Sequence, residues 1–113
     1  MTRARIVRGR ATQGLAAAYW QQHGWPHAEP VWGSQPGRDV TGMPGLAPEI
    51  KATRDDPILG GLRQAQRNAG HDVPFVVWRP NGYGPERIGE WVMAFTLHHG
   101  TELLRGAGYG DGL

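Results

Sequence analysis

The chain has 113 residues, no cysteine, a net charge of +2 and a pI near 9.5. The lack of cysteine excludes a disulfide framework and a thiolate metal site, and no apolar stretch is long enough to span a membrane. One domain with one hydrophobic core is expected. Because no segment resembles a signal peptide, we expect a soluble cytoplasmic protein with no membrane partner.

The first ten residues carry alternating arginines: Arg3, Arg5, Arg8 and Arg10. We predict residues 1–10 to be a flexible basic arm. Such an arm could neutralise DNA phosphates and would make binding depend on salt. The alternative is a solvated, frayed terminus with no binding role.

The remaining pattern predicts an α/β fold. Apolar residues at helical spacing predict a first helix over about 11–23, which Gly24 ends. Asp55 or Asp56 caps a second helix that has Pro57 at its first position and stops at Gly70. The other expected elements are strands over 28–32, 39–42, 49–52, 74–79 and 90–96, turns over 33–37 and 43–45, a loop over 81–85, and a short helix over 99–106.

A single lysine stands out in this sequence. Eleven of the twelve basic residues are arginine, and only Lys51 is lysine. An ammonium is a compact charge with a movable pKa, whereas a guanidinium is a planar fork that stays protonated. Lys51 follows Glu49 by two positions, so both side chains project from the same face if this segment is a strand.

Asp39 opens an earlier extended run, and Pro44 and Gly45 predict a turn after it. A hairpin between the two runs would bring Asp39 beside Glu49. Two adjacent carboxylates repel unless a cation lies between them, and Mg²⁺ commonly takes one or two carboxylates together with a substrate phosphate. Asp39, Glu49 and Lys51 therefore predict a metal-dependent nuclease site. A surface salt-bridge cluster is the alternative, but it leaves the lone lysine unexplained.

This Asp, spacer, Glu-X-Lys pattern resembles the PD-(D/E)XK nuclease superfamily. The flanking phrases resemble its small Holliday junction resolvase-like members, which are common in actinobacteria and their phages. The resemblance covers roughly residues 8 to 111. The phrases that carry it are residues 24–29, 36–42, 44–46, 49–51 and 107–111, together with Gln64-Ala65.

The resemblance implies a single-domain restriction-endonuclease-like fold, with a mixed central sheet flanked by helices, over 1–113. It implies Mg²⁺, which Mn²⁺ can replace, held by Asp39, Glu49 and the Ile50 carbonyl. Lys51 would orient the attacking water. Gln64 would orient substrate or water, unless it is a solvent-facing amide.

The group often carries a glutamate in its first helix, and the matching position here is Gln13. A glutamine can ligate through its carbonyl oxygen but brings no negative charge. Arg38, beside Asp39, is a further candidate for DNA contact.

The resulting hypothesis is an endonuclease that cuts branched DNA, first of all Holliday junctions, in the cytoplasm of the cell or of a phage host. Two matched nicks need two sites, so a homodimer is expected. The alternatives are a non-catalytic DNA-binding module that keeps the nuclease fold, and a repair or restriction-type nuclease.

Overall fold

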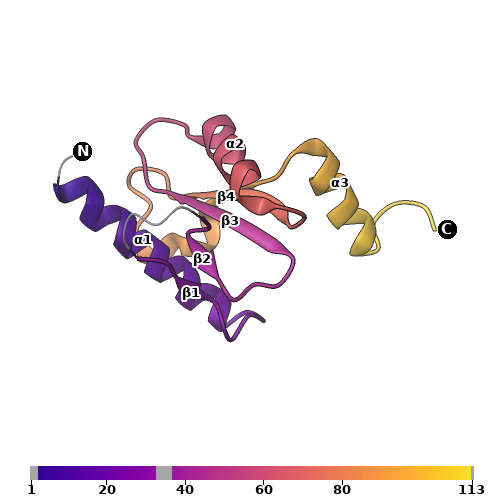
Figure 1. Cartoon of the computed structure of the whole chain (residues 1–113), viewed down its shortest axis with the longest axis horizontal. Coiled ribbons are helices and arrows are strands. Elements are labelled where there is room, and N and C mark those ends of the chain that lie inside the picture. The colour runs from indigo at the N-terminus through magenta and orange to yellow at the C-terminus, as the bar shows by residue number, and fades with distance from the viewer. Residues whose placement is uncertain (1–2, 33–36, 113) are drawn as a thin grey trace.

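The structure is a computed structural model that describes residues 3–32 and 37–112. The predicted turn over 33–37 lies outside the described residues, except for Gly37. The elements run in the order α1 (Arg3–Gln21), β1 (Glu29–Pro30), β2 (Val40–Thr41), β3 (Leu46–Lys51), α2 (Ile58–Ala69), β4 (Val73–Trp78), the 3₁₀ helix η1 (Pro85–Glu90), β5 (Val92–Ala94) and α3 (Leu97–Gly106) (Figure 1).

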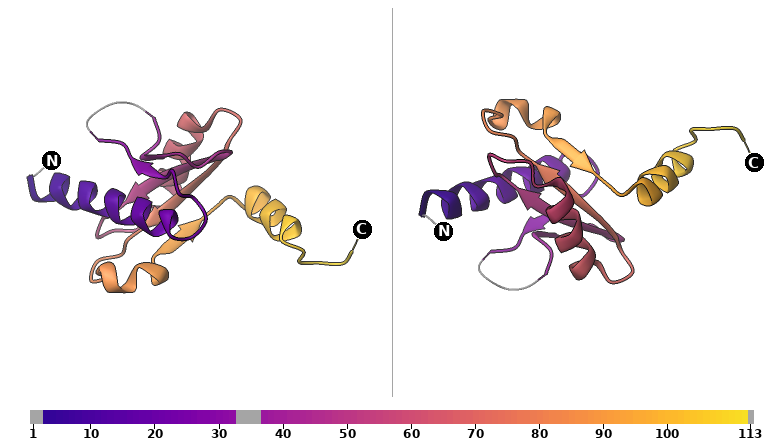
Figure 2. Two further views of the ribbon diagram at one scale, coloured as in Figure 1. Left: turned by 90° about the horizontal axis from the view of Figure 1, so that it is seen from below. Right: turned by 90° about the horizontal axis from the view of Figure 1, so that it is seen from above.

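The central sheet is mixed, as predicted. It has the order β3-β4-β5, in which β3 and β4 are parallel and β4 and β5 are antiparallel. Helices α1 and α2 lie on opposite faces of this sheet, as the two views of Figure 2 show. The fold is therefore α/β in a single domain, with the parallel β3-α2-β4 unit at its centre.

The core on the α1 side combines aliphatic residues with several aromatic rings. Phe75 of β4 is 1% exposed and lies against Trp20 and Phe95, with ring centroids 6.0 and 4.9 Å away. Ile50 of β3 and Val77 of β4 belong to the same cluster. Since side chains alternate along a strand, Glu49 and Lys51 must face the other side, which α2 covers.

Helix α2 forms where the sequence predicts it. The Asp56 carboxylate accepts a hydrogen bond from the Ile58 N–H at 2.8 Å, and Pro57 takes the N-cap position, one residue earlier in the helix than expected. Gly70 ends the helix with a positive φ of 57°. Local signals were sufficient here because capping and turn residues act within a few positions of the helix end.

Two expectations about the first half of the chain were wrong. Helix α1 begins at Arg3, so the described part of the expected arm, residues 3–10, is helical. The run that starts at Asp39 forms no ladder with β3. Strand β2 pairs with β1 instead, with Val40 opposite Pro30.

Smaller differences concern element ends. β3 begins at Leu46 rather than Glu49, so it includes Pro48, and β1 is only two residues long. Residues 85–90 form η1 and leave only Val92–Ala94 for the last strand. Helix α3 starts at Leu97, where Thr96 caps it by accepting a hydrogen bond from the His99 N–H. α3 projects away from the rest of the domain in every view (Figures 1 and 2).

Candidate active site

Strand β3 presents Glu49 and Lys51 to the α2 side of the sheet. Glu49 is 2% exposed, and Lys51 Nζ lies 3.5 Å from its Oε1. Gly61 of α2 allows the helix to approach closely, because a Cβ there would lie 2.7 Å from Cγ2 of Val76 and 3.7 Å from Cγ of Lys51. The burial of Glu49 does not fit a surface salt-bridge cluster.

The close approach of α2 also brings Gln64 to the lysine. Lys51 Nζ donates a hydrogen bond to Gln64 Oε1 at 2.8 Å. The ammonium is thus held between an amide oxygen and a carboxylate, with its side chain 26% exposed. Gln64 is therefore part of the site rather than an amide with no protein partner, and its role toward substrate or water stays a prediction.

Asp39 reaches the same place from the other edge of β3. Its N–H donates to the Pro48 carbonyl at 3.3 Å, and its Oδ2 accepts from the Ile50 N–H at 2.7 Å. Pro48 and Ile50 therefore turn their backbone groups toward Asp39 and away from β4. The missing N–H of Pro48 therefore removes no bond to β4, which explains how β3 includes a proline.

The proximity of Asp39 and Glu49 was predicted correctly, although the hairpin that was to produce it is absent. Two individual hydrogen bonds join Asp39 to β3, instead of the strand ladder that was expected. The Ile50 carbonyl lies on the same edge of β3 as its N–H, because both backbone groups of a strand residue point the same way. That places the third predicted ligand on the Asp39 side.

Arg38 anchors the segment that carries Asp39. Its guanidinium forms a salt bridge with Asp72 at 2.6 Å and donates to the carbonyls of Leu46 and Ala69 at 3.1 and 3.0 Å. These contacts tie the start of β3 and the end of α2 to Asp39. Arg38 therefore has a positioning role in the fold, and its predicted contact with DNA stays a prediction.

The electrostatics of the site centre on Glu49. The pKa of this carboxyl is raised from 4.5 to about 7, first by burial and then by the negative charge of Asp39, while the charge of Lys51 lowers it. A carboxyl in this state is costly to ionise at neutral pH. A cation between the two carboxylates would remove the repulsion.

The donor set suits a hard divalent cation. Asp39, Glu49 and the Ile50 carbonyl offer oxygen atoms only, which Mg²⁺ and Mn²⁺ prefer. No group of three or more His, Cys, Asp or Glu side chains converges anywhere in residues 3–32 and 37–112. A metal here would therefore complete its coordination with the backbone, water or substrate.

Gln13 lies on α1, directly after the buried Thr12, and is itself half-buried. Within the described part of the chain, no hydrogen bond joins its side chain to Asp39 or Glu49. Its place in the metal site therefore stays a prediction.

The arginines of α1 divide into two kinds. Arg3, Arg5 and Arg10 are exposed. Arg8 is half-buried, and its Nε donates to the carbonyl of Ala52, directly after β3, at 3.1 Å. Arg79, which lies at the same end of the sheet, is not among the residues that the sequence predicts for the site. Its only sequence signal is its position directly after the buried run that forms β4.

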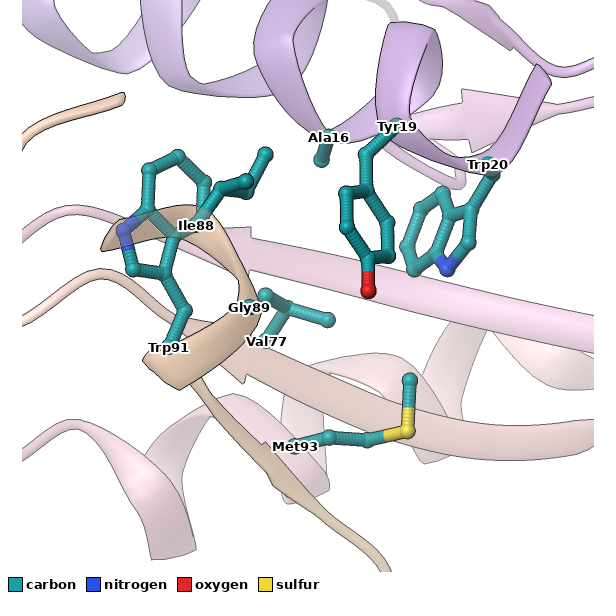
Figure 3. Close-up of a pocket in the computed structure, with 8 residues that line it drawn as sticks. All are labelled: Ala16, Tyr19, Trp20, Val77, Ile88, Gly89, Trp91 and Met93. Carbon is teal, nitrogen blue, oxygen red and sulfur yellow. The ribbon is translucent and has the colours of Figure 1, made fainter. Parts of the chain in front are cut away.

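A cavity of about 210 Å³ lies elsewhere, on the α1 face of the sheet. The Tyr19 hydroxyl points into it (Figure 3). Its walls are mainly apolar and contain no carboxylate; they are formed by Ala16, Tyr19, Trp20, Val77, Ile88, Gly89, Trp91 and Met93. The sheet separates this cavity from Glu49 and Lys51, so it belongs to a different part of the molecule.

Comparison with protein-family models, with curated proteins and with solved structures gives no match. None of the helices in the described part of the chain is long and apolar enough to cross a membrane.

Proposed function

We propose that the chain is a metal-dependent endonuclease of the PD-(D/E)XK type that hydrolyses phosphodiester bonds in branched DNA, with Holliday junctions as the first candidate substrate. The observation that carries this proposal is the convergence of Asp39, Glu49 and Lys51 at one end of β3, with Gln64 on the lysine. The buried carboxyl of Glu49 and the half-buried carboxylate of Asp39, which repel one another when both are charged, favour a cation-binding role.

Each residue of the cluster has a defined task in this proposal. Asp39, Glu49 and the Ile50 carbonyl would hold Mg²⁺ or Mn²⁺, and Gln13 is a further position to examine. A bound metal of this kind supplies an acidified water and stabilises charge on the phosphate. Lys51 would orient the attacking water, while Gln64 fixes the direction of the ammonium by accepting its hydrogen bond.

A substrate panel tests the proposed function. The protein is incubated with four-way junction, flap, nicked and linear DNA of matched sequence, in Mg²⁺, Mn²⁺, Ca²⁺ or EDTA. We expect cleavage only in Mg²⁺ and Mn²⁺, with paired nicks in the junction. Cleavage of flap or linear DNA alone would indicate a repair or restriction-type nuclease. Equal DNA binding in Mg²⁺ and EDTA without cleavage would contradict the nuclease and indicate a binding module.

Helix α3 is the surface that we assign to the homodimer. It has no buried residue, and Leu97, Leu103 and Leu104 are 88%, 42% and 58% exposed. Val92 and Met93 of the edge strand β5, which precedes α3 in the chain, are also exposed. A second copy fits this surface because an interface with two-fold symmetry uses the same patch twice, and a junction offers two equivalent strands to cut.

We expect the protein to sediment at twice its 12.4 kDa chain mass. Leu103→Glu with Leu104→Glu should yield monomers, because two charges would have to be buried in the interface. Glu102→Lys, a charge change at an exposed position on the opposite side of the same helix from Leu103 and Leu104, is the control and should leave the mass unchanged. Sedimentation equilibrium measures both. A wild-type monomer, or a dimer that survives the leucine substitutions, would contradict this interface.

A further inference from the structure

Two arginines from distant parts of the sequence meet beyond the carboxyl end of β3. The N–H of Arg79, directly after β4, donates to the Lys51 carbonyl at 2.8 Å. The Nε of Arg8, on α1, donates to the Ala52 carbonyl at 3.1 Å. The two are close enough for the charge of Arg8 to lower the pKa of Arg79, an effect that adds to the larger one of burial.

The side chain of Arg79 is held in one direction. Its Nε donates to the Tyr83 carbonyl at 2.8 Å, and its Nη1 donates to Thr12 Oγ1 at 3.1 Å. Its Cζ lies 5.3 Å from the centroid of the Trp91 ring. Thr12 is fully buried and donates its own hydroxyl hydrogen to the Arg8 carbonyl. Thr12 thus links the two arginines.

Neither arginine forms a salt bridge with a carboxylate of the described residues, although the charge of Glu86 partly offsets the lowering of the Arg79 pKa. Among the residues that the structure describes, salt bridges occur at Arg38 and Arg87 but at neither Arg8 nor Arg79. Within the described residues, the side chain of Arg8 donates through Nε alone, so its terminal nitrogens keep their hydrogen-bond donors. Two guanidiniums that repel one another and form no salt bridge with an acid make a site suited to an oxyanion, and forked donors match phosphate oxygens.

We propose that Arg8 and Arg79 together bind one phosphodiester group of the DNA strand, next to the phosphate that is cleaved. This inference rests on the proposed function. β3 carries Glu49 and Lys51 on its α2 face, while Arg79 points to the α1 face and Arg8 comes from α1 itself. Both groups meet at the same end of the strand. A DNA strand that crosses this end would contact Lys51 and the arginine pair in succession.

The test measures binding of labelled junction and linear DNA by fluorescence anisotropy over a series of KCl concentrations, with Ca²⁺ in place of Mg²⁺. Arg8→Gln and Arg79→Gln should each weaken binding and reduce the slope of log K against log[KCl] by about 0.9, the value for one phosphate contact. The double variant should lose about 0.9 as well, because both arginines hold the same phosphate.

Arg67→Gln is the charge-matched control and should keep the wild-type slope. Arg67 is exposed near the end of α2, which lies beside the start of β3 and therefore far from the arginine pair. An unchanged slope in Arg8→Gln would overturn the proposal, and so would a loss of about 1.8 in the double variant, which would mean two separate phosphates. If Arg79→Gln does not fold, the slope of Arg8→Gln decides alone.

Further measurements separate this inference from the proposed function. If the variants show the expected loss of slope but the wild type does not cleave DNA in Mg²⁺, the nuclease proposal is contradicted and the phosphate site is supported. If the wild type cleaves DNA but the variants keep the wild-type slope, the phosphate site is contradicted and the nuclease proposal is supported. A wild-type protein that binds no DNA would overturn both. Inorganic phosphate that raises the melting temperature of the wild type but not of Arg8→Gln, without any change in the DNA slopes, would indicate a free-anion site and overturn the assignment to DNA.

Discussion

Glu49→Gln is expected to abolish Mg²⁺-dependent cleavage and, without metal, to raise the stability of the protein above pH 7. The pKa of Glu49 is about 7 in the folded protein and 4.5 as a reference, because burial and Asp39 disfavour its charge. Below pH 4.5 the carboxyl is neutral in both states, so the folded protein carries no ionisation penalty. As pH rises from 4.5 to 7 the wild type loses stability, and the full loss, on the order of 3 kcal/mol at most, is present above pH 7.

Glutamine has nearly the same shape and no charge, so the variant avoids this loss. The stability difference between variant and wild type should be near zero at pH 4.5 and grow to its maximum above pH 7. Mg²⁺ should stabilise the wild type by mass action and stabilise the variant much less. Thermal unfolding followed by circular dichroism, in EDTA and in Mg²⁺ across this pH range, measures both effects.

Glu29→Gln serves as the control, because Glu29 is exposed on β1 and its substitution removes the same formal charge. It should show neither the pH-dependent gain in stability nor the altered response to Mg²⁺. Equal responses to Mg²⁺ in Glu49→Gln and the wild type would contradict the assignment of Glu49 as a metal ligand.

Lys51→Arg is expected to reduce cleavage at least about tenfold although it keeps the positive charge. The ammonium fits between Gln64 Oε1 at 2.8 Å and Glu49 Oε1 at 3.5 Å. Gly61 and Val76 bound the space beside the lysine stem, since a Cβ on Gly61 would already be too close to Val76. A planar guanidinium is wider, and it cannot hold a water in the same place.

Single-turnover cleavage of the preferred substrate measures the loss, and anisotropy in Ca²⁺ checks that DNA binding survives. Arg54→Lys is the complementary control, a charge-conserving exchange at an exposed position three residues after Lys51. It should cleave at the wild-type rate. Cleavage near the wild-type level by Lys51→Arg would show that an arginine can replace the lysine. It would contradict a specific role for the lone lysine.

The sequence by itself determined the features that depend on neighbours along the chain. The alternation of a strand predicts that Glu49 and Lys51 share a face. Asp56, Pro57 and Gly70 mark the ends of α2 because caps and turns act within a few residues. The turn at 43–45 also returns the chain far enough to bring Asp39 near Glu49.

Tertiary structure decided which segments become partners. Strand β2 pairs with β1 rather than β3. The partner of a strand depends on how its buried face packs against α1 and the core, which a local sequence pattern cannot predict. The burial of Glu49 depends on the close approach of α2 at Gly61. That burial raises the pKa of Glu49, a consequence that Glu-X-Lys spacing cannot predict.

The roles of the arginines show the same division. The spacing of the arginines predicted a flexible basic arm over residues 1–10, yet residues 3–10 are helical. Arg8, one of these arginines, donates to the Ala52 carbonyl directly after β3. Arg38 ties β3 to α2, and Arg79 meets Arg8 across 71 positions of sequence. A charge is visible in the sequence, but its partner depends on which chain segments fold together, since electrostatic and hydrogen-bond contacts act over a few ångströms.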